Sequence, residues 1–174
     1  QDVIGDAAAV VVLTLHRVLT SDERRRAYSE DGIVVSRENF EALTRHLARH
    51  FDVVHLSTLA EGNWPQPSQR PRVAITFDDG WQDNYRPVLD ALSHHGTPIT
   101  IFVCSGLTGR TSPFWPERVR ALLAEASEAE RQQMIQRLKP LPRSDREAAI
   151  AVLEKQGADR NMLHSGSADA TMSW

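Results

Sequence analysis

A short hydrophobic segment that ends in two adjacent carboxylates constrains the fold of this chain more than any other feature. Residues Val73–Thr76 are apolar or β-branched, which is typical of a buried strand, and Asp78, Asp79 and Gly80 follow closely. Two carboxylates directly after a buried strand are costly unless a cation or a substrate interacts with them. Gly80 permits a tight turn that would direct both acids toward one site. Because α/β folds place their chemistry at the C-terminal ends of parallel strands, we predict a functional site here.

The order of the other segments predicts an α/β fold. Apolar runs indicate further strands and amphipathic patterns indicate helices, in the order strand 10–15, helix 36–50, strand 51–56, helix 84–94 and strand 100–104. A strand, a helix and a second strand at this spacing form a βαβ unit, so the strands at 73–76 and 100–104 should be parallel.

Two more detailed expectations concern the second half of this unit. The helix at 84–94 should end at Gly96 and should turn its large apolar residues inward, namely Tyr85, Val88, Leu89 and Leu92. The single cysteine, Cys104, excludes an internal disulfide. Because Cys104 follows an apolar run, we expect a buried, unreactive thiol.

The chain changes character after Gly109. Three amphipathic segments, 116–126, 127–138 and 144–156, predict a helical insertion over residues 113–156 that follows the third main strand. Ser127 with Glu130 and Ser144 with Glu147 have the spacing of capping boxes. The small, polar residues 157–174 predict a mobile tail. We therefore expect a single domain over residues 1–174, with an α/β core at about 10–110.

Composition excludes several classes of function. The chain has 174 residues, of which 41% are hydrophobic and 25% charged, as in an ordinary globular domain. A formal net charge of −3 does not indicate the excess of basic residues that nucleic-acid-binding proteins carry. No apolar run reaches the roughly 20 residues of a membrane helix, so we expect no membrane span. The apolar segment 7–15 has no basic flank before it and indicates a strand rather than a signal peptide, which leaves the compartment open.

The motif Thr76-Phe77-Asp78-Asp79-Gly80 resembles that of the polysaccharide deacetylases, the NodB-homology enzymes of carbohydrate esterase family 4. The resemblance extends over roughly residues 10–125 and includes five further segments, namely Leu13–Val18, the helix with Phe40, Leu43 and Leu47, Tyr85–Leu89, Thr97–Val103 and Phe114-Trp115. It implies a partial (β/α) barrel of the NodB-homology type. The implied reaction is hydrolysis of N-acetyl, sometimes O-acetyl, groups on an acetylated glycan substrate with the help of a divalent metal, usually zinc.

The resemblance also implies roles for individual residues. Asp78 would be the general base and Asp79 a metal ligand, with His16 and Trp81 as possible residues of the active-site rim. Such chemistry needs this pairing, because a zinc ion lowers the pKa of its bound water toward about 7 and a nearby carboxylate must then accept the proton.

The chain departs from the family pattern at the metal site. The family completes the site with two histidines in a block of His, Ser or Thr, three residues and His. No such block occurs here, although His164-Ser165 matches its start. Because zinc needs three protein ligands, we expect a truncated deacetylase domain that is inactive as this fragment. A barrel interrupted after about three strands also leaves a sheet edge exposed, through which the chain could self-associate.

Three alternatives remain open at this point. Asp78 and Asp79 could be a helix cap and a solvated loop acid. An aspartate-based phosphoryl transferase also begins with an acid at a strand end, although such sites generally use two acids separated by one residue. A catalytically silent module that binds a glycan or a partner would keep the fold without turnover, with Trp64, Trp81 or Trp115 stacking on sugar rings.

Overall fold

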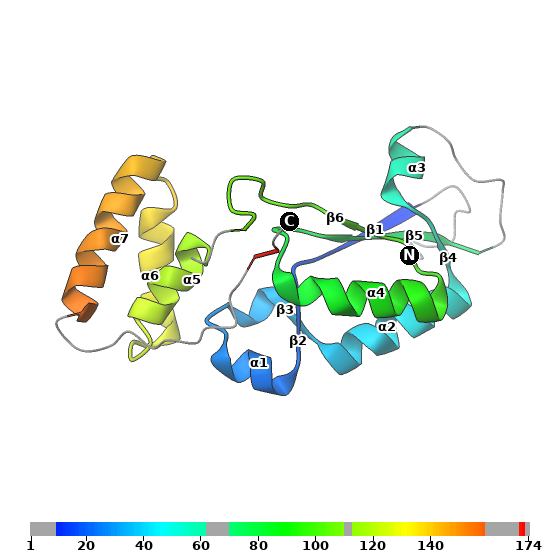
Figure 1. Cartoon of the computed structure of the whole chain (residues 1–174), viewed down its shortest axis with the longest axis horizontal. Helices are drawn as coiled ribbons and strands as arrows, with labels where there is room; N and C mark the ends of the chain where they lie inside the picture. The colour runs from blue at the N-terminus through cyan, green and yellow to red at the C-terminus, as the bar shows by residue number, and fades with distance from the viewer. Residues whose placement is uncertain (1–9, 62–69, 110–112, 159–170, 173–174) are drawn as a thin grey trace, which may run out of the picture.

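The fold is that of a computed structural model, which describes residues 10–61, 70–109, 113–158 and 171–172 (Figure 1). The strands are β1 (Val10–Leu15), β2 (Arg17–Leu19), β3 (Val34–Ser36), β4 (Asp52–Val53), β5 (Arg72–Phe77) and β6 (Ile99–Ile101). The α-helices are α1 (Ser21–Arg26), α2 (Arg37–His50), α3 (Leu56–Ala60), α4 (Tyr85–His95), α5 (Trp115–Leu122), α6 (Glu128–Leu138) and α7 (Arg143–Ala158). Two short 3₁₀ turns are η1 (Asp31–Ile33) and η2 (Gln82–Asn84).

Strand β5 is the centre of a four-stranded parallel sheet. β1 pairs with β5 along its whole length, from Val10 opposite Arg72 to Leu15 opposite Phe77. The other edge of β5 is shared by β4 at its start and β6 at its end. A second, two-stranded parallel sheet joins β2 to β3. The predicted α/β class is therefore confirmed, with parallel strands that alternate with helices and a helical segment after β6.

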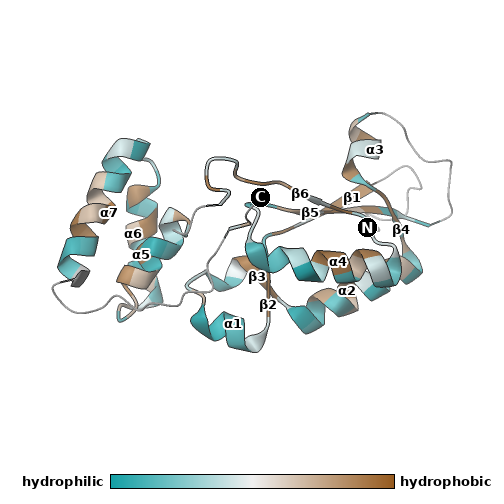
Figure 2. Ribbon diagram, in the orientation of Figure 1, coloured by the Kyte–Doolittle hydropathy of each residue, from teal (hydrophilic) through white to brown (hydrophobic). Residues whose placement is uncertain are grey.

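The main core lies between β5 and the helices α2 and α4. Alternate residues of a strand share one face, and Val73, Ile75 and Phe77 all enter the same buried cluster. Phe77 meets Phe40 of α2 edge to face, with ring centroids 5.5 Å apart. All six residues of β5 are buried, and the strand is drawn largely in hydrophobic colours in Figure 2. This burial fixes the position of the acid pair that follows Phe77.

Helices α5, α6 and α7 form a second unit with a core of its own. Val119, Ile135, Leu138 and Ile150 are buried together and have no member in common with the main core. The predicted capping box of Ser127 and Glu130 starts α6. The capping box predicted for Ser144 does not form, because α7 already begins at Arg143 and Ser144 lies inside its first turn.

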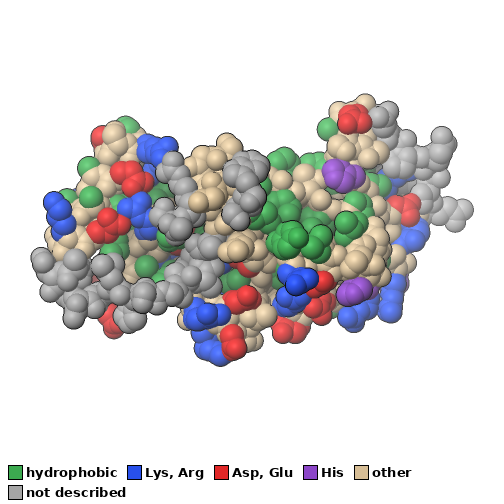
Figure 3. Space-filling model, in the orientation of Figure 1, with side chains coloured by type: hydrophobic (Ala, Val, Ile, Leu, Met, Phe, Trp, Pro, Cys, Tyr) green, Lys and Arg blue, Asp and Glu red, His purple; other side chains and the backbone are tan. Residues whose placement is uncertain are grey.

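The prediction of the buried face of α4 is wrong for three of its four residues, since only Val88 packs against the main core. The buried residues of α4, which is in contact with α2, are Pro87 and Ala91. Tyr85, Leu89 and Leu92 lie on the open side, where Tyr85 is 60% and Leu92 51% exposed. Figure 3 shows hydrophobic side chains gathered on this face, over α4 and β6. Gly96 does end the helix in the left-handed conformation, as predicted.

Cys104 also differs from its prediction. Strand β6 ends at Ile101, so Cys104 lies in the following loop and its thiol is exposed. The predicted strand at 51–56 is reduced to Asp52–Val53, because α3 begins at Leu56. Most of the predicted tail at 157–174 falls outside the described residues, as do Trp64 and His164. Within the described ranges, no helix combines the length and the hydrophobicity that a membrane span requires.

Candidate active site

The acid pair lies at the C-terminal edge of the central sheet. The backbone N–H of Asp78 donates to the carbonyl of Leu15 at 2.9 Å, and the N–H of Phe102 donates to the carbonyl of Phe77 at 2.7 Å. Backbone pairing with both neighbouring strands thus continues up to the acids. Asp78 and Asp79 are each partly exposed, so both carboxylates can reach a ligand from this edge.

The turn after the acid pair uses two consecutive residues with positive φ. Asp79 has a φ of 73° and Gly80 a φ of 70°. Aspartate tolerates this left-handed conformation better than most residues. At Gly80 a Cβ atom would lie 2.9 Å from Cγ1 and 3.1 Å from Cα of Val103. The turn therefore requires glycine both for its backbone angle and for the close approach of Val103.

Residues Thr171 and Met172 return to this turn from the far end of the chain. The N–H of Met172 donates to the carbonyl of Gly80, and the N–H of Gly109 donates to the carbonyl of Met172, both at 2.9 Å. Thr171 forms an antiparallel bridge with Trp81. The turn that carries the acids is thus bonded to β1 on one side, through Asp78, and to residues 171–172 on the other.

Trp81 is packed behind Asp79. Its indole Nε1 donates to Oδ2 of Asp79 at 3.3 Å. Its ring lies 4.6 Å from that of Phe114 and 4.1 Å from Cζ of Arg17, which is a cation–π distance. Because the side chain is only 1% exposed, the hypothesis that Trp81 stacks on a sugar ring is wrong. Its position instead orients the carboxylate of Asp79.

Arg17 is a fully buried charge beneath Trp81. Its Nε and Nη2 donate to Oδ2 of Asp83 at 3.1 and 2.7 Å, and its Nη1 donates to Oγ of Ser29 at 2.8 Å. The hydroxyl of Ser29 in turn donates to Oε1 of Glu117, at the start of α5, at 3.1 Å. Burial raises the pKa of Asp83, while the Arg17 guanidinium and the N–H of Val18 act in the opposite direction.

His16 lies next to Arg17 at the end of β1 and is held through its backbone. The side-chain amide of the buried Asn84 donates to the carbonyl of His16 at 2.9 Å. This contact fixes the chain between β1 and β2 against the turn that follows the acid pair. The His16 side chain lines the same cavity as Asp79 and Trp81.

This cavity has a volume of about 460 Å³ and opens between the acid motif and the helical unit. One wall comes from the sheet side and includes His16, Asp79 and Trp81. The opposite wall comes from the segment that leads into α5 and from α6. Two other cavities, one lined by residues of α1, η1 and α6 and one by residues of α2 and α4, include neither Asp78 nor Asp79.

The described residues do not form a complete metal site. Within the part of the chain that the structure describes, no group of three histidine, cysteine or acidic residues could hold a metal ion. Asp79 and Asp78 could each supply a carboxylate oxygen, whereas a zinc site takes three protein ligands. The donor set described therefore does not fit zinc.

Cys104 is close enough to Asp78 and Asp79 for their charges to change the pKa of its thiol. Partial loss of contact with water raises the pKa of its thiol, and the charges of Asp79 and Asp78 raise it further. A thiol with a raised pKa is mostly protonated at neutral pH and is a poor nucleophile. The predicted lack of reactivity is thus supported by the charge of the acids, although the predicted burial of Cys104 is wrong.

Sequence reasoning did not assign a role to Arg17, Asp83 or Glu117. Their buried contacts join segments that are 12 to 88 positions apart in the chain. The signals available in the sequence were a polar His16-Arg17 pair directly after an apolar strand and an acid, Asp83, four residues beyond Asp79. Neither signal identifies its partner.

A family model matches part of this chain. A sequence model of the family described as polysaccharide deacetylase matches residues 66–133, which include the acid pair. Among solved structures, the chain is similar to IcaB from Ammonifex degensii, with 26% identity and a TM-score of 0.46. It is also similar to the deacetylase PplD of Streptococcus pyogenes, solved with acetate (19%, 0.48), and to a de-N-acetylase from Aggregatibacter actinomycetemcomitans (18%, 0.43).

The chain is shorter than these proteins. The matches cover 63%, 59% and 56% of this chain, in the same order, but only 46%, 46% and 38% of the solved chains. The search of curated proteins finds no match. The family model confirms the resemblance predicted from the sequence over residues 66–133, which carry the acid motif.

The first prediction concerns Gly80. Replacing it with Ala should lower the free energy of unfolding by about 1–2 kcal/mol for the left-handed backbone, and by more for the contact with Val103. Gly109→Ala is the matched control, because Gly109 has a φ of 76° but no atom within 4 Å of the place its Cβ would take. Urea denaturation of both variants measures the difference. Equal losses would contradict the close approach at Gly80.

The second prediction concerns the buried ion pair. Asp83→Asn removes the carboxylate from a fully buried arginine and should reduce the free energy of unfolding by about 3–5 kcal/mol. Asp22→Asn, which breaks the solvent-exposed pair with Arg25, should cost less than about 1 kcal/mol. A similar cost for both changes in chemical denaturation would show that the Arg17–Asp83 pair does not support the fold.

Proposed function

Because residues 66–133 match the polysaccharide deacetylases and contain the paired acids, we propose that this chain carries the acid motif of a deacetylase that hydrolyses N-acetyl, or O-acetyl, groups on a glycan. The observation that carries the proposal is the position of Asp78 and Asp79. They follow a buried parallel strand, they are held in a constrained turn, and Asp79 lines a cavity of ligand size.

In the proposed reaction, Asp78 accepts a proton from the water that attacks the acetyl carbonyl carbon. The carbon–nitrogen bond then breaks, acetate leaves, and the sugar nitrogen takes up a proton to become a free amine. Asp79 would serve as a metal ligand, oriented by the indole N–H of Trp81. His16 would lie at the rim of the site, in the same cavity.

The described residues supply too few metal ligands for a metal-dependent reaction by this chain alone. The family implies a divalent metal, for which zinc is our proposal. Asp79 without two further protein ligands would hold such an ion weakly. We therefore propose that the chain as given is inactive, and that full activity needs ligands beyond those of the described residues.

A second candidate is a silent module that binds an acetylated glycan without hydrolysing it. The incomplete donor set within the described ranges favours this function for the chain as given. Of the tryptophans considered for sugar stacking, Trp115 lines the cavity and is only partly buried, with the guanidinium of Arg146 over one face of its ring, 4.9 Å from the centroid. The two candidates differ in whether turnover appears once a metal is held.

Metal content and acetate release test the proposal together. The chain is incubated with zinc, desalted, analysed for metal, and then assayed with N-acetylglucosamine oligomers. We expect well below one equivalent of zinc and no acetate. One equivalent of zinc with acetate release would contradict the proposed inactivity and would end the silent-module alternative.

Substitutions of the two acids test their separate roles. Asp79→Asn should lower the affinity for zinc, because it removes a proposed ligand, whereas Asp78→Asn should leave that affinity nearly unchanged. In any form that turns over, Asp78→Asn should still abolish acetate release, because the base is lost. Equal loss of zinc affinity in both variants would overturn this assignment.

We further propose that the chain self-associates through its open sheet edges. Among the described residues, no strand pairs with the outer edge of β1 or with the outer edges of β4 and β6. Such edges present unpaired backbone groups to other strands. Analytical ultracentrifugation should therefore show a mass that rises with protein concentration. A monomer at all concentrations up to the solubility limit would contradict this proposal.

A further inference from the structure

We propose that the helical unit forms a second sugar subsite, in which α6 binds a residue of the glycan next to the one that is deacetylated. The inference rests on the proposed function, since it assumes that the reacting sugar lies at Asp79. It assigns a binding role to Gln136 and Lys139, which lie on the far side of the cavity from the acid motif.

The cavity is larger than the reaction alone requires. An acetyl group has three heavy atoms besides the nitrogen it acylates, whereas the cavity of about 460 Å³ falls in the range of sites that bind whole small molecules. Its walls run from His16 and Asp79 to α6. A glycan whose acetyl group reaches Asp79 can therefore fill this cavity only if its neighbouring sugar residue lies along the helical unit.

The far wall presents long polar side chains at helical spacing. Gln132, Gln136 and Lys139 occupy positions i, i+4 and i+7 of α6 and its end, so they share one face of the helix. Amide and ammonium groups are donors, and the amides are also acceptors, which suits sugar hydroxyls. Phe114 and Trp115 add aromatic surface to the same wall.

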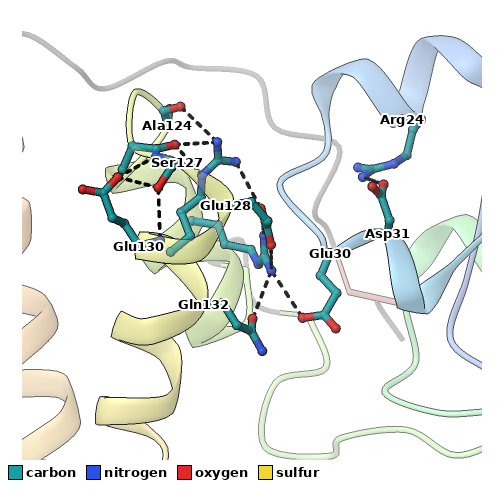
Figure 4. Close-up of polar contacts among 11 residues, drawn as sticks. Arg24, Glu30, Asp31, Ala124, Ser127, Glu128, Glu130 and Gln132 are labelled. Carbon is teal, nitrogen blue, oxygen red and sulfur yellow. Dashed lines mark hydrogen bonds and ion pairs between the residues drawn. The ribbon is translucent and has the colours of Figure 1, made fainter.

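The wall is held against the α/β core by a buried arginine. Arg120, 2% exposed, donates to Glu128 at 2.7 and 2.9 Å and to Glu30 at 3.3 Å. It also donates to Oε1 of Gln132 at 3.4 Å. Figure 4 shows Glu30 reaching from the core toward this contact, with Glu128 and Gln132 on the side of the helical unit. Since Oε1 of Gln132 is engaged, its amide nitrogen remains as the donor for a ligand.

The charges of the cavity favour an uncharged sugar over a polyanion. Two of the lining residues are basic, Arg120 and Lys139, and three are acidic, Glu30, Asp79 and Glu117. Arg120 is already paired with two glutamates. A phosphate-rich ligand would meet these acids without a free cluster of cations, whereas a neutral acetylated sugar meets hydrogen-bonding groups and aromatic surface.

Binding of N-acetylglucosamine oligomers tests the subsite on the chain as given. Titration calorimetry should give tighter binding for the pentamer than for the monomer. The double variant Gln136→Ala/Lys139→Ala should weaken pentamer binding about tenfold or more, as expected for the loss of hydrogen bonds to a ligand, and should leave monomer binding unchanged. The matched control is Gln133→Ala/Arg137→Ala, because both residues are exposed on α6 and do not line the cavity.

Each outcome decides the proposal. Pentamer binding that is absent, equal to monomer binding or equally weakened in the control would overturn the subsite. The four substituted positions are all exposed and none belongs to a core. Circular dichroism of both double variants should therefore match that of the unchanged chain, which excludes a general loss of structure. If the oligomer binds as expected but no form with a retained metal releases acetate, the proposed hydrolysis fails and the subsite stands as part of a glycan-binding module.

Discussion

The guanidinium group of Arg17 is a positive charge in the interior of the molecule, and three separate parts of the chain meet around it. A buried charge is stable only when carboxylates and hydrogen-bond acceptors replace the water that it has lost. Here Asp83 supplies the carboxylate, Ser29 supplies an acceptor that leads on to Glu117, and the ring of Trp81 covers the face of the group. The same contacts orient the turn of the acid pair and attach the start of α5, so the arginine couples the proposed catalytic edge to the helical unit.

The two units of the chain are joined by polar contacts more than by a shared hydrophobic core. Each unit has its own buried cluster, and the links between them include the ion pair of Arg120 with Glu30, the contact of Ser29 with Glu117 and the ring contact of Trp81 with Phe114. Directional contacts of this kind define one relative placement of the units. A cavity formed between them therefore keeps its shape only as long as these pairs are intact.

Sequence patterns predicted the elements well where the cause is local. Strand β5 follows from its unbroken apolar run, and Ser36, Ser127 and Gly96 act as helix caps as predicted. The buried face of α4 was predicted only in part, at Val88, because a helix with apolar residues on two sides does not reveal which side meets α2. The Arg17 network was missed for a related reason, since its partners are brought together only by the completed fold. Cys104 was misplaced because β6 ends three residues earlier than its apolar run suggests.

The left-handed backbone at Asp79 limits what evolution or an engineer can place beside the cavity. Of the residues with oxygen donors, aspartate and asparagine adopt such angles with the least strain, because their short side chains can bond to the nearby backbone. Glutamate would bring the same carboxylate on a longer stem but at a higher conformational cost, and β-branched residues would suffer most. The backbone conformation alone thus favours aspartate over glutamate at this position, independently of any catalytic role. In related sequences, Asp or Asn before the glycine that corresponds to Gly80 accordingly indicates that the turn is retained. Only Asp at that position indicates that the negative charge is retained as well.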